Sequence, residues 1–289
     1  IRIIVGDPAA LLAFRLAQQA MCIQRRWSSP ARPRLLWRPF QLAFQLLTIG
    51  GIANPAHAGA PTADRLTMDL LWFPTGGGKT EAYLGLTAFT LFLRRLRAEG
   101  AEAADGVAVI MRYTLRLLTV QQFERAARLV VACDYIRRTR PDGVELLGDT
   151  VFAIGLWVGS GATANDLEAA ETAEEQKRAR QLARCPACGD ASLDWRIDRA
   201  TFEVRCRTAG CDVEDVPLGI WTIDEVIYGR RPALLIGTID KFAQVVRKED
   251  THELFRGTPP ELIIQDELHL ISGPLGTLAG IYEAAIDLI

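Results

Sequence analysis

The stretch best suited to chemistry is a glycine turn that ends in lysine and threonine. An apolar run at residues 68–72 precedes the turn and helix-forming residues follow it, so the order strand, loop, helix is expected. Glycines let successive backbone N–H groups point at one anion, and the helix N-terminus adds partial positive charge. We expect this loop to hold the phosphates of a nucleotide triphosphate through Thr75, Gly76, Gly77, Gly78, Lys79 and Thr80.

The last two residues of the loop have separate expected roles. Lys79 would reach the β and γ phosphates as a point charge, and the Thr80 hydroxyl would occupy one position on Mg²⁺. The loop departs from the strict G-x-x-x-x-G-K-[ST] pattern because Phe73 stands at the first glycine. The alternative is a flexible turn with a chance Lys-Thr, which the flanking strand and helix patterns disfavour.

Two carboxylates near the other end of the chain complement this loop. They are Asp266 and Glu267, which follow an apolar run at residues 261–265. Ligands gather at the carboxyl ends of parallel strands, where both segments are expected to lie. Asp266 would hold Mg²⁺, and Glu267 would orient and deprotonate the water that attacks the γ-phosphate. By itself the pair is also compatible with a surface turn, but its combination with the phosphate loop disfavours that alternative.

The elements that must position these residues alternate between strand and helix patterns. Short apolar runs at residues 107–111, 151–158, 232–237 and 261–265 predict buried strands, and helical periodicity covers residues 80–97 and 120–136. This alternation predicts an α/β fold, a three-layer sandwich with a mostly parallel sheet covered on both faces. Residues 8–24, with Asp7 as N-cap, and residues 40–47 predict a helical N-terminal segment.

Four cysteines occur in two pairs with metal-ligand spacing. Cys185 and Cys188 form the first pair, Cys206 and Cys211 the second, and the alternating residues between them predict a hairpin. Four thiolates on two turns predict a tetrahedral Zn²⁺ site in a structural ribbon. Residues 166–184, acidic first and basic last, predict a solvated helical stalk. Cys22 and Cys133 are unpaired and are expected in the core.

The first 40 residues are locally basic. They carry a net charge of +6, from the lone Asp7 and seven arginines: Arg2, Arg15, Arg25, Arg26, Arg32, Arg34 and Arg38. A nucleic-acid surface and an ordinary solvated surface explain this cluster equally well. Gln41 has two interpretations as well, because a glutamine upstream of the phosphate loop reads the adenine edge in several motor ATPases. An exposed glutamine at a helix start is the alternative.

Composition limits the remaining possibilities. The chain has 289 residues and a formal charge of −2, so it has no overall electrostatic signature of nucleic-acid binding. No apolar run reaches the 18 residues that a membrane span needs, and the cysteine pattern suits a reducing cytoplasm. The chain starts at Ile1 rather than Met, so we expect it to be a piece of a longer protein.

Together these motifs resemble those of superfamily 2 helicases of the Asp-Glu-x-His kind. Residues 74–80 resemble motif I, residues 266–269 motif II, residues 113–122 loosely motif Ia, and residues 237–241 a strand-contacting loop in which Ile239 replaces proline. Residues 73–83, 235–242 and 265–276 more closely resemble the helicase subunit of the DISARM anti-phage system. The resemblance implies that Thr114, Thr238 and Lys241 contact nucleic acid and that His269 couples the site to a later motif.

The resemblance also implies a domain organisation and an activity. Residues 1–60 would be a helical segment with a Q-motif-like stretch, and residues 61–289 a RecA-like P-loop NTPase lobe, interrupted at 166–217 by the stalk and zinc ribbon. The implied activity is ATP-driven movement on DNA, with ATP, Mg²⁺ and Zn²⁺ as cofactors and a DISARM subunit as partner. The first lobe alone would hydrolyse ATP weakly. Two alternatives remain: a P-loop switch or remodeller that does not translocate, and a zinc-ribbon nucleic-acid-binding module with an inactive ATP site.

Overall fold

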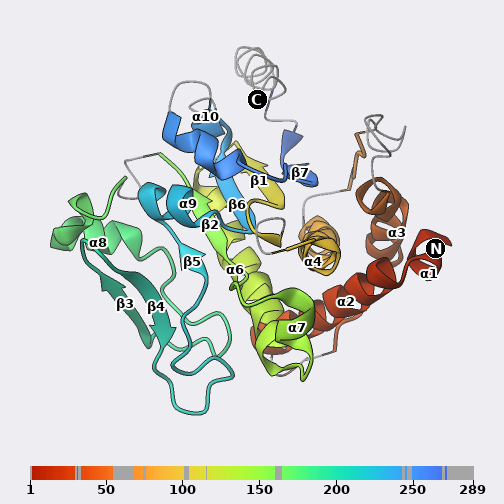
Figure 1. The fold of residues 1–289 in the computed structure, drawn as a ribbon, viewed down its shortest axis with the longest axis horizontal. Helices are drawn as coiled ribbons and strands as arrows, with labels where there is room; N and C mark the ends of the chain where they lie inside the picture. The colour runs from red at the N-terminus through yellow and green to blue at the C-terminus, as the bar shows by residue number, and fades with distance from the viewer. Residues whose placement is uncertain are drawn as a thin grey trace.

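The computed structural model describes residues 2–29, 31, 34–54, 68–73, 76–100, 104–114, 116–159, 165–242, 245, 249–268 and 271. Five strands form its main sheet in the order β5-β2-β6-β1-β7 (Figure 1). Their bounds are β1 Val109–Tyr113, β2 Ile154–Trp157, β5 Ile220–Trp221, β6 Leu234–Thr238 and β7 Leu262–Gln265. All neighbouring pairs are parallel. The α/β class and the parallel sheet are therefore confirmed.

Helices cover both faces of this sheet. The connection from β1 to β2 runs through α6 (Arg116–Thr139), and the connection from β5 to β6 runs through α9 (Asp224–Arg230) in the opposite direction along the sheet. Right-handed crossovers place such helices on opposite faces. Accordingly, α6 and α4 (Lys79–Arg97) contact the sheet on one face, while α9 and α10 (Ile239–Phe242) contact β2 and β6 (Figure 1).

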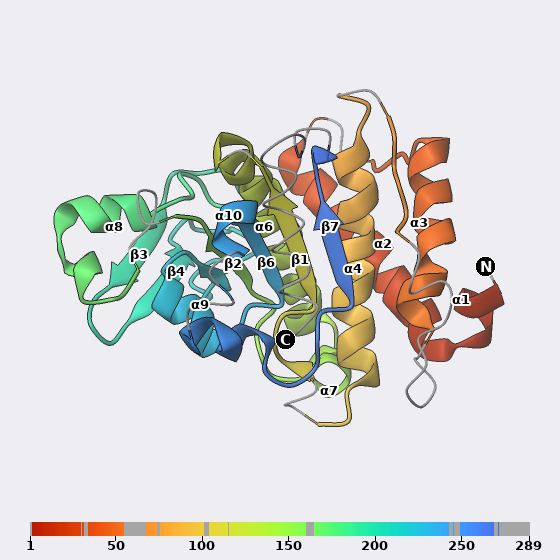
Figure 2. The same cartoon turned by 90° about the horizontal axis from the view of Figure 1, so that it is seen from above.

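The N-terminal helices form a further layer outside α4. They are α1 (Arg2–Gly6), α2 (Pro8–Ser28) and α3 (Pro39–Ala53), and Figure 2 shows α2 and α3 beside α4. Asp7 caps α2 as predicted, because its Oδ1 accepts from the Ala9 and Ala10 amides at 2.9 and 3.2 Å. The small residues of α2 let it lie against both α4 and α6, with Ala13, Ala17 and Ala20 fully buried.

The apolar run before the phosphate loop is not a strand, so that prediction was wrong. Residues 68–73 are irregular and largely exposed, and Trp72 has 86% of its surface accessible. A β-strand requires a neighbouring strand that hydrogen-bonds to its backbone N–H and C=O groups. Within the described ranges the sheet ends at β7, and residues 68–73 pair with none of its strands.

The cysteine-rich insertion contains the predicted hairpin. Strands β3 (Leu193–Ile197) and β4 (Phe202–Cys206) pair antiparallel. The expected solvated stalk is wrong, because residues 166–184 break into η2 (Ala169–Glu171) and α8 (Ala173–Ala179). Ala170, Ala179 and Leu182 are buried, and the Thr222 hydroxyl donates to the Ala179 carbonyl at 2.6 Å. Packing, rather than solvation of a charged helix, therefore determines this segment.

Several short elements were not predicted. They include α1, β5, α9 and α10, as well as α7 (Gly143–Leu147), beside α6, and η3 (Glu249–Phe255), beside α9. Cys133 is buried as expected, whereas Cys22 is exposed on α2, so its assignment to the core was wrong. None of the helices in the described part of the chain is both long and apolar enough to cross a bilayer.

Candidate nucleotide-binding site

The glycine turn and the acidic pair line one cavity of about 1120 Å³. We call it the phosphate-loop cavity. Its walls include Gly76, Gly78, Lys79, Thr80, Asp266 and Glu267. The structure therefore brings together two segments from opposite ends of the sequence. Thr75 and His269, two other predicted site residues, lie outside the described residues.

The loop is held from behind by the helical N-terminal segment. The Gln41 side chain is buried; its Nε2 donates to the Gly78 carbonyl at 2.7 Å and its Oε1 accepts from the Arg38 amide at 2.9 Å. Arg38 also donates to the Gly77 carbonyl at 2.6 Å. Of the two interpretations of Gln41, an exposed helix-start residue is therefore excluded. Gln41 lines the cavity and fixes the loop backbone.

The conformation of the loop explains its glycines. Gly78 has φ +91°, a left-handed conformation that favours glycine, and precedes the first turn of α4. A Cβ at Gly78 would lie 2.8 Å from the Gln41 Nε2. Phe73, at the first-glycine position of the usual pattern, stacks on Phe40 with ring centroids 3.8 Å apart. The departure from the pattern thus provides a second anchor between α3 and the loop.

Tyr83 joins the two halves of the site. Its hydroxyl donates to Asp266 Oδ2 at 2.7 Å and lies 3.1 Å from Thr80 Oγ1. Burial, with Asp266 nearby, raises the pKa of Tyr83 well above its usual value, so the phenol remains protonated and serves as a donor. Burial and Asp266 also raise the pKa of Tyr113. One hydroxyl therefore connects the two residues expected to hold Mg²⁺.

The backbone at the end of β7 positions the acidic pair. The Asp266 amide donates to the Arg112 carbonyl of β1 at 3.1 Å, and the Glu267 amide donates to Asp266 Oδ1 at 2.9 Å. Glu267 has φ +52°, a conformation that costs a non-glycine residue about 1 kcal/mol or more. At the other end of β7, buried Arg94 of α4 forms an ion pair with Glu261 at 2.6 Å. Helix α4 is thus tied to β7 at both ends.

Five arginines also line this cavity, which was not foreseen. Three come from the basic N-terminal segment and two from α6: Arg25, Arg34, Arg38, Arg125 and Arg128. The arginine cluster in the first 40 residues could have indicated a basic cavity, but it was interpreted only as a nucleic-acid surface or a solvated surface. Arg125 is paired with Glu81, whereas Lys79 has no ion pair with any residue of the described chain. The cavity is therefore predominantly basic.

The three predicted nucleic-acid contacts have different environments. Thr114 follows β1 and Thr238 ends β6, so both lie at the carboxyl edge of neighbouring strands. Lys241 is only 2% exposed, and its ammonium is 2.5 Å from Asp224 Oδ2, which is equally buried. Lys241 therefore does not present its charge at the surface in this conformation.

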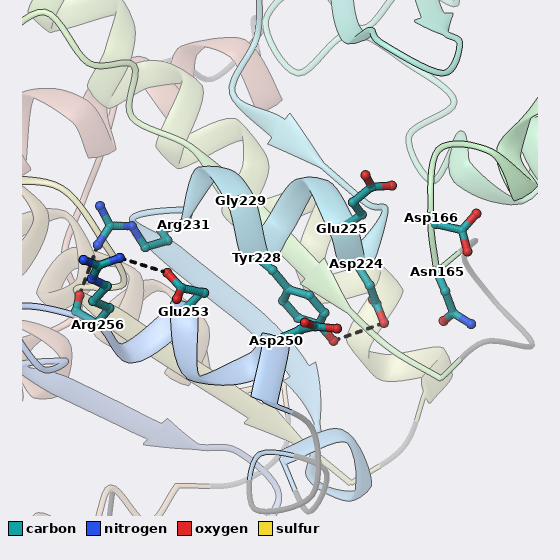
Figure 3. A pocket seen from close by; sticks show the side chains of 10 residues that line it. All are labelled: Asn165, Asp166, Asp224, Glu225, Tyr228, Gly229, Arg231, Asp250, Glu253 and Arg256. Atoms are coloured by element: carbon teal, nitrogen blue, oxygen red, sulfur yellow. Dashed lines mark hydrogen bonds and ion pairs between the residues drawn. The ribbon is translucent and has the colours of Figure 1, made fainter.

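Asp224 also lines a second cavity, of about 670 Å³, which we call the acidic cavity (Figure 3). Most of the carboxylates that line this cavity form hydrogen bonds or ion pairs with nearby residues. Glu225 Oε2 accepts from the Leu167 amide at 2.8 Å, and Asp166 Oδ1 accepts from the Ala169 amide at 2.6 Å. Figure 3 shows Glu253 directed toward Arg256, with which it pairs at 3.6 Å. This cavity lies between the segment that precedes η2, helix α9 and η3.

The four cysteine sulfurs form one compact cluster. All lie within 4.8 Å of one another, with Cys185 to Cys211 at 3.9 Å and Cys188 to Cys206 at 3.8 Å. A tetrahedron with Zn–S bonds of about 2.3 Å has S–S edges of about 3.8 Å. Gly189, directly after Cys188, and Gly210, directly before Cys211, both have positive φ and allow the chain to turn at each pair. The cluster therefore fits Zn²⁺.

A parallel five-stranded sheet with helices on both faces and ligand groups at the strand ends is of the RecA-like class. No protein-family model matches this chain. It is similar to the DISARM protein DrmA of Bacillus paralicheniformis, with 36% identity over an alignment 312 positions long that covers 89% of this chain and 27% of that protein. This similarity extends over most of the chain, which spans about a quarter of the length of this curated relative.

Proposed function

We propose that this chain is the first motor lobe of an ATP-dependent DNA helicase or translocase that acts in anti-phage defence. The observation that carries the proposal is the shared phosphate-loop cavity, in which Tyr83 joins Thr80 to Asp266. The similarity to DrmA supports the defence role and a DISARM subunit as partner. We also propose that the protein is cytoplasmic and that it moves along DNA.

The residues of the phosphate-loop cavity are assigned separate roles in ATP hydrolysis. Lys79 would neutralise the β and γ phosphates, and Gly76, Gly77 and Gly78 would contact them through the backbone. Thr80 and Asp266 would hold Mg²⁺, and Glu267 would orient the attacking water and accept its proton. Bound Mg²⁺–ATP supplies the electrophilic γ-phosphoryl group. An arginine from across the cleft contributes about 10³ to 10⁵ in rate in related NTPases, so this lobe alone would be slow.

ATPase and strand-displacement assays on the full-length protein test this proposal. Lys79→Ala and Glu267→Gln should each remove DNA-stimulated ATP hydrolysis, whereas Lys177→Ala, at an exposed lysine of α8, should not. Persistence of DNA stimulation in the first two variants would refute the assignment. Hydrolysis without any strand displacement or movement on DNA would instead favour a non-translocating switch.

The cysteine cluster is proposed to hold one Zn²⁺ per chain. Four thiolates at these distances match the metal in number and geometry. Metal analysis should find about one zinc per chain, and Cys188→Ser should lower that content. A folded wild-type chain that contains no metal would contradict the zinc assignment without affecting the ATP site.

A further inference from the structure

The cysteine cluster contacts the end of helix α2 through a residue next to a metal-ligating position. Asp212 follows Cys211 directly, and its Oδ2 accepts hydrogen bonds from Trp27 Nε1 at 2.7 Å and Arg26 at 3.0 Å. Trp27 also packs edge-on against Tyr135 of α6, with ring centroids 5.8 Å apart. One carboxylate therefore binds the last turn of α2 from the side of the ribbon.

The other cysteine pair contacts α6. Pro186 lies between Cys185 and Cys188, and its carbonyl accepts from Arg128 Nε at 2.9 Å. Helices α2 and α6 are also joined directly, because Gln24 Nε2 donates to the Arg125 carbonyl at 3.1 Å. The two cysteine pairs thus hold two helices that are already in contact with each other.

Both helices form one wall of the phosphate-loop cavity. The end of α2 contributes Arg25 and Ser28, Ser29 follows it, and α6 contributes Arg125 and Arg128. The last turn of a helix lacks intrahelical partners for its carbonyls and opens readily. Side-chain contacts from outside the helix are therefore what can hold such an end in place.

We propose that the metal-bound cysteine cluster positions this wall for nucleotide binding, with Asp212 as the positioning residue. A single ion that binds all four sulfurs fixes the two pairs relative to each other, and Asp212 and Pro186 transmit that geometry to α2 and α6. The expected effect on nucleotide affinity rests on the proposed function. The contacts of the ribbon with α2 and α6 are independent of that proposal.

The test compares two exposed carboxylates of the ribbon in the full-length protein. Asp212→Ala removes the contact, whereas Asp190→Ala changes a carboxylate that has no partner among the described residues. Asp212→Ala should retain about one zinc per chain, speed amide exchange at residues 24–29 and weaken binding of a fluorescent ATP analogue about fivefold, the size expected for one hydrogen bond of ordinary net strength. Asp190→Ala should match wild type in all three. Chelation of zinc from wild type should speed the same amides.

A double-mutant cycle separates this role from general destabilisation. Trp27→Phe keeps the ring against Tyr135 but removes the shorter of the two hydrogen bonds to Asp212, so it should reproduce part of the loss of affinity, and the double variant should be no worse than Asp212→Ala alone. Unchanged exchange at residues 24–29 in Asp212→Ala would overturn the proposal. Faster exchange with unchanged nucleotide affinity would overturn the positioning role. If wild type binds no nucleotide, the proposed function fails, and the exchange data still decide whether the ribbon holds α2.

Discussion

The two cavities of this chain use charge in different ways. In the phosphate-loop cavity the cationic groups line an open space, and Lys79 has no ion pair with any described residue. In the acidic cavity, buried Asp224 is paired with Lys241, and Figure 3 shows Glu253 directed toward Arg256, its ion-pair partner. A charge without a local partner is available for a ligand, whereas a buried paired charge is committed to the fold. We therefore expect substitutions in the phosphate-loop cavity to change ligand binding, and substitutions of the buried pair at the acidic cavity to change the stability of the fold.

The largest expected effect is on stability, at Lys241. Lys241→Met leaves the Asp224 carboxylate buried without its cation and should lower the free energy of unfolding by about 3 to 5 kcal/mol. Denaturant unfolding measures this. The double variant Lys241→Met with Asp224→Leu should recover much of the loss, because no charge then remains buried. A stable Lys241→Met protein that binds DNA poorly would break the comparison and restore the lysine as a nucleic-acid contact.

The next largest effect concerns the loop backbone. Gly78→Ala places a Cβ 2.8 Å from the Gln41 Nε2 at a residue with φ +91°, and should weaken nucleotide binding by about 1 to 3 kcal/mol. Calorimetric titration with an ATP analogue measures this. Gly76→Ala is the matched control, since Gly76 has φ +79° and open space around its Cβ position. Equal losses in both variants would mean that backbone strain, not the contact with Gln41, sets the affinity.

Tyr83→Phe should have a smaller effect, on the link between Thr80 and Asp266. Loss of the hydroxyl removes a hydrogen bond to a carboxylate, about 1.5 kcal/mol, and should raise the Mg²⁺ concentration needed for half-maximal ATP hydrolysis. Tyr135→Phe keeps the ring of another partly buried tyrosine, and no hydrogen bond of its hydroxyl is present among the described residues, so it serves as control. If Mg²⁺ dependence is identical in both variants, Tyr83 has no part in placing the metal.

The smallest effect lies away from both cavities, at Asp7. The hydrogen bond from Arg97 holds the pKa of Asp7 below its usual value, so this ion pair stabilises the fold above the unfolded-state pKa and is lost as pH falls through the folded-state pKa. Asp7→Asn keeps a capping side chain and should cost about 0.5 kcal/mol at neutral pH. Thermal unfolding at pH 7 and pH 3 should show a smaller difference in acid. A constant difference would indicate loss of the cap instead.

Much of the fold followed from local pattern. Buried parallel strands have continuous apolar runs. The runs that form β1, β2, β6 and β7 are short and flanked by turn residues, so they could be recognised in the sequence. The antiparallel hairpin and the cysteine spacing were equally local. The run at residues 68–72 has the same composition but no partner strand in the described chain, which a sequence pattern does not reveal.

The candidate site was only half predictable. The glycine turn and the acidic pair carry their chemistry in their residue types, so their meeting could be expected from the rule that ligands gather at strand ends. Tyr83, Arg125 and Arg128 carry no such signal, because a tyrosine or arginine on an amphipathic helix is commonplace. They reach the site only because α4 and α6 pack on the same face of the sheet.

The sequence by itself determined the glycine turn, the carboxylate pair, the two cysteine pairs and the alternation of strand and helix, because each depends on neighbouring residues. Only the tertiary structure decided which charges are committed and which remain available. Lys79 and Lys241 are the same residue type, the first expected to contact the phosphates of the nucleotide and the second to contact nucleic acid. Burial against Asp224 turned one into a structural ion pair, while an open cavity wall left the other without a partner.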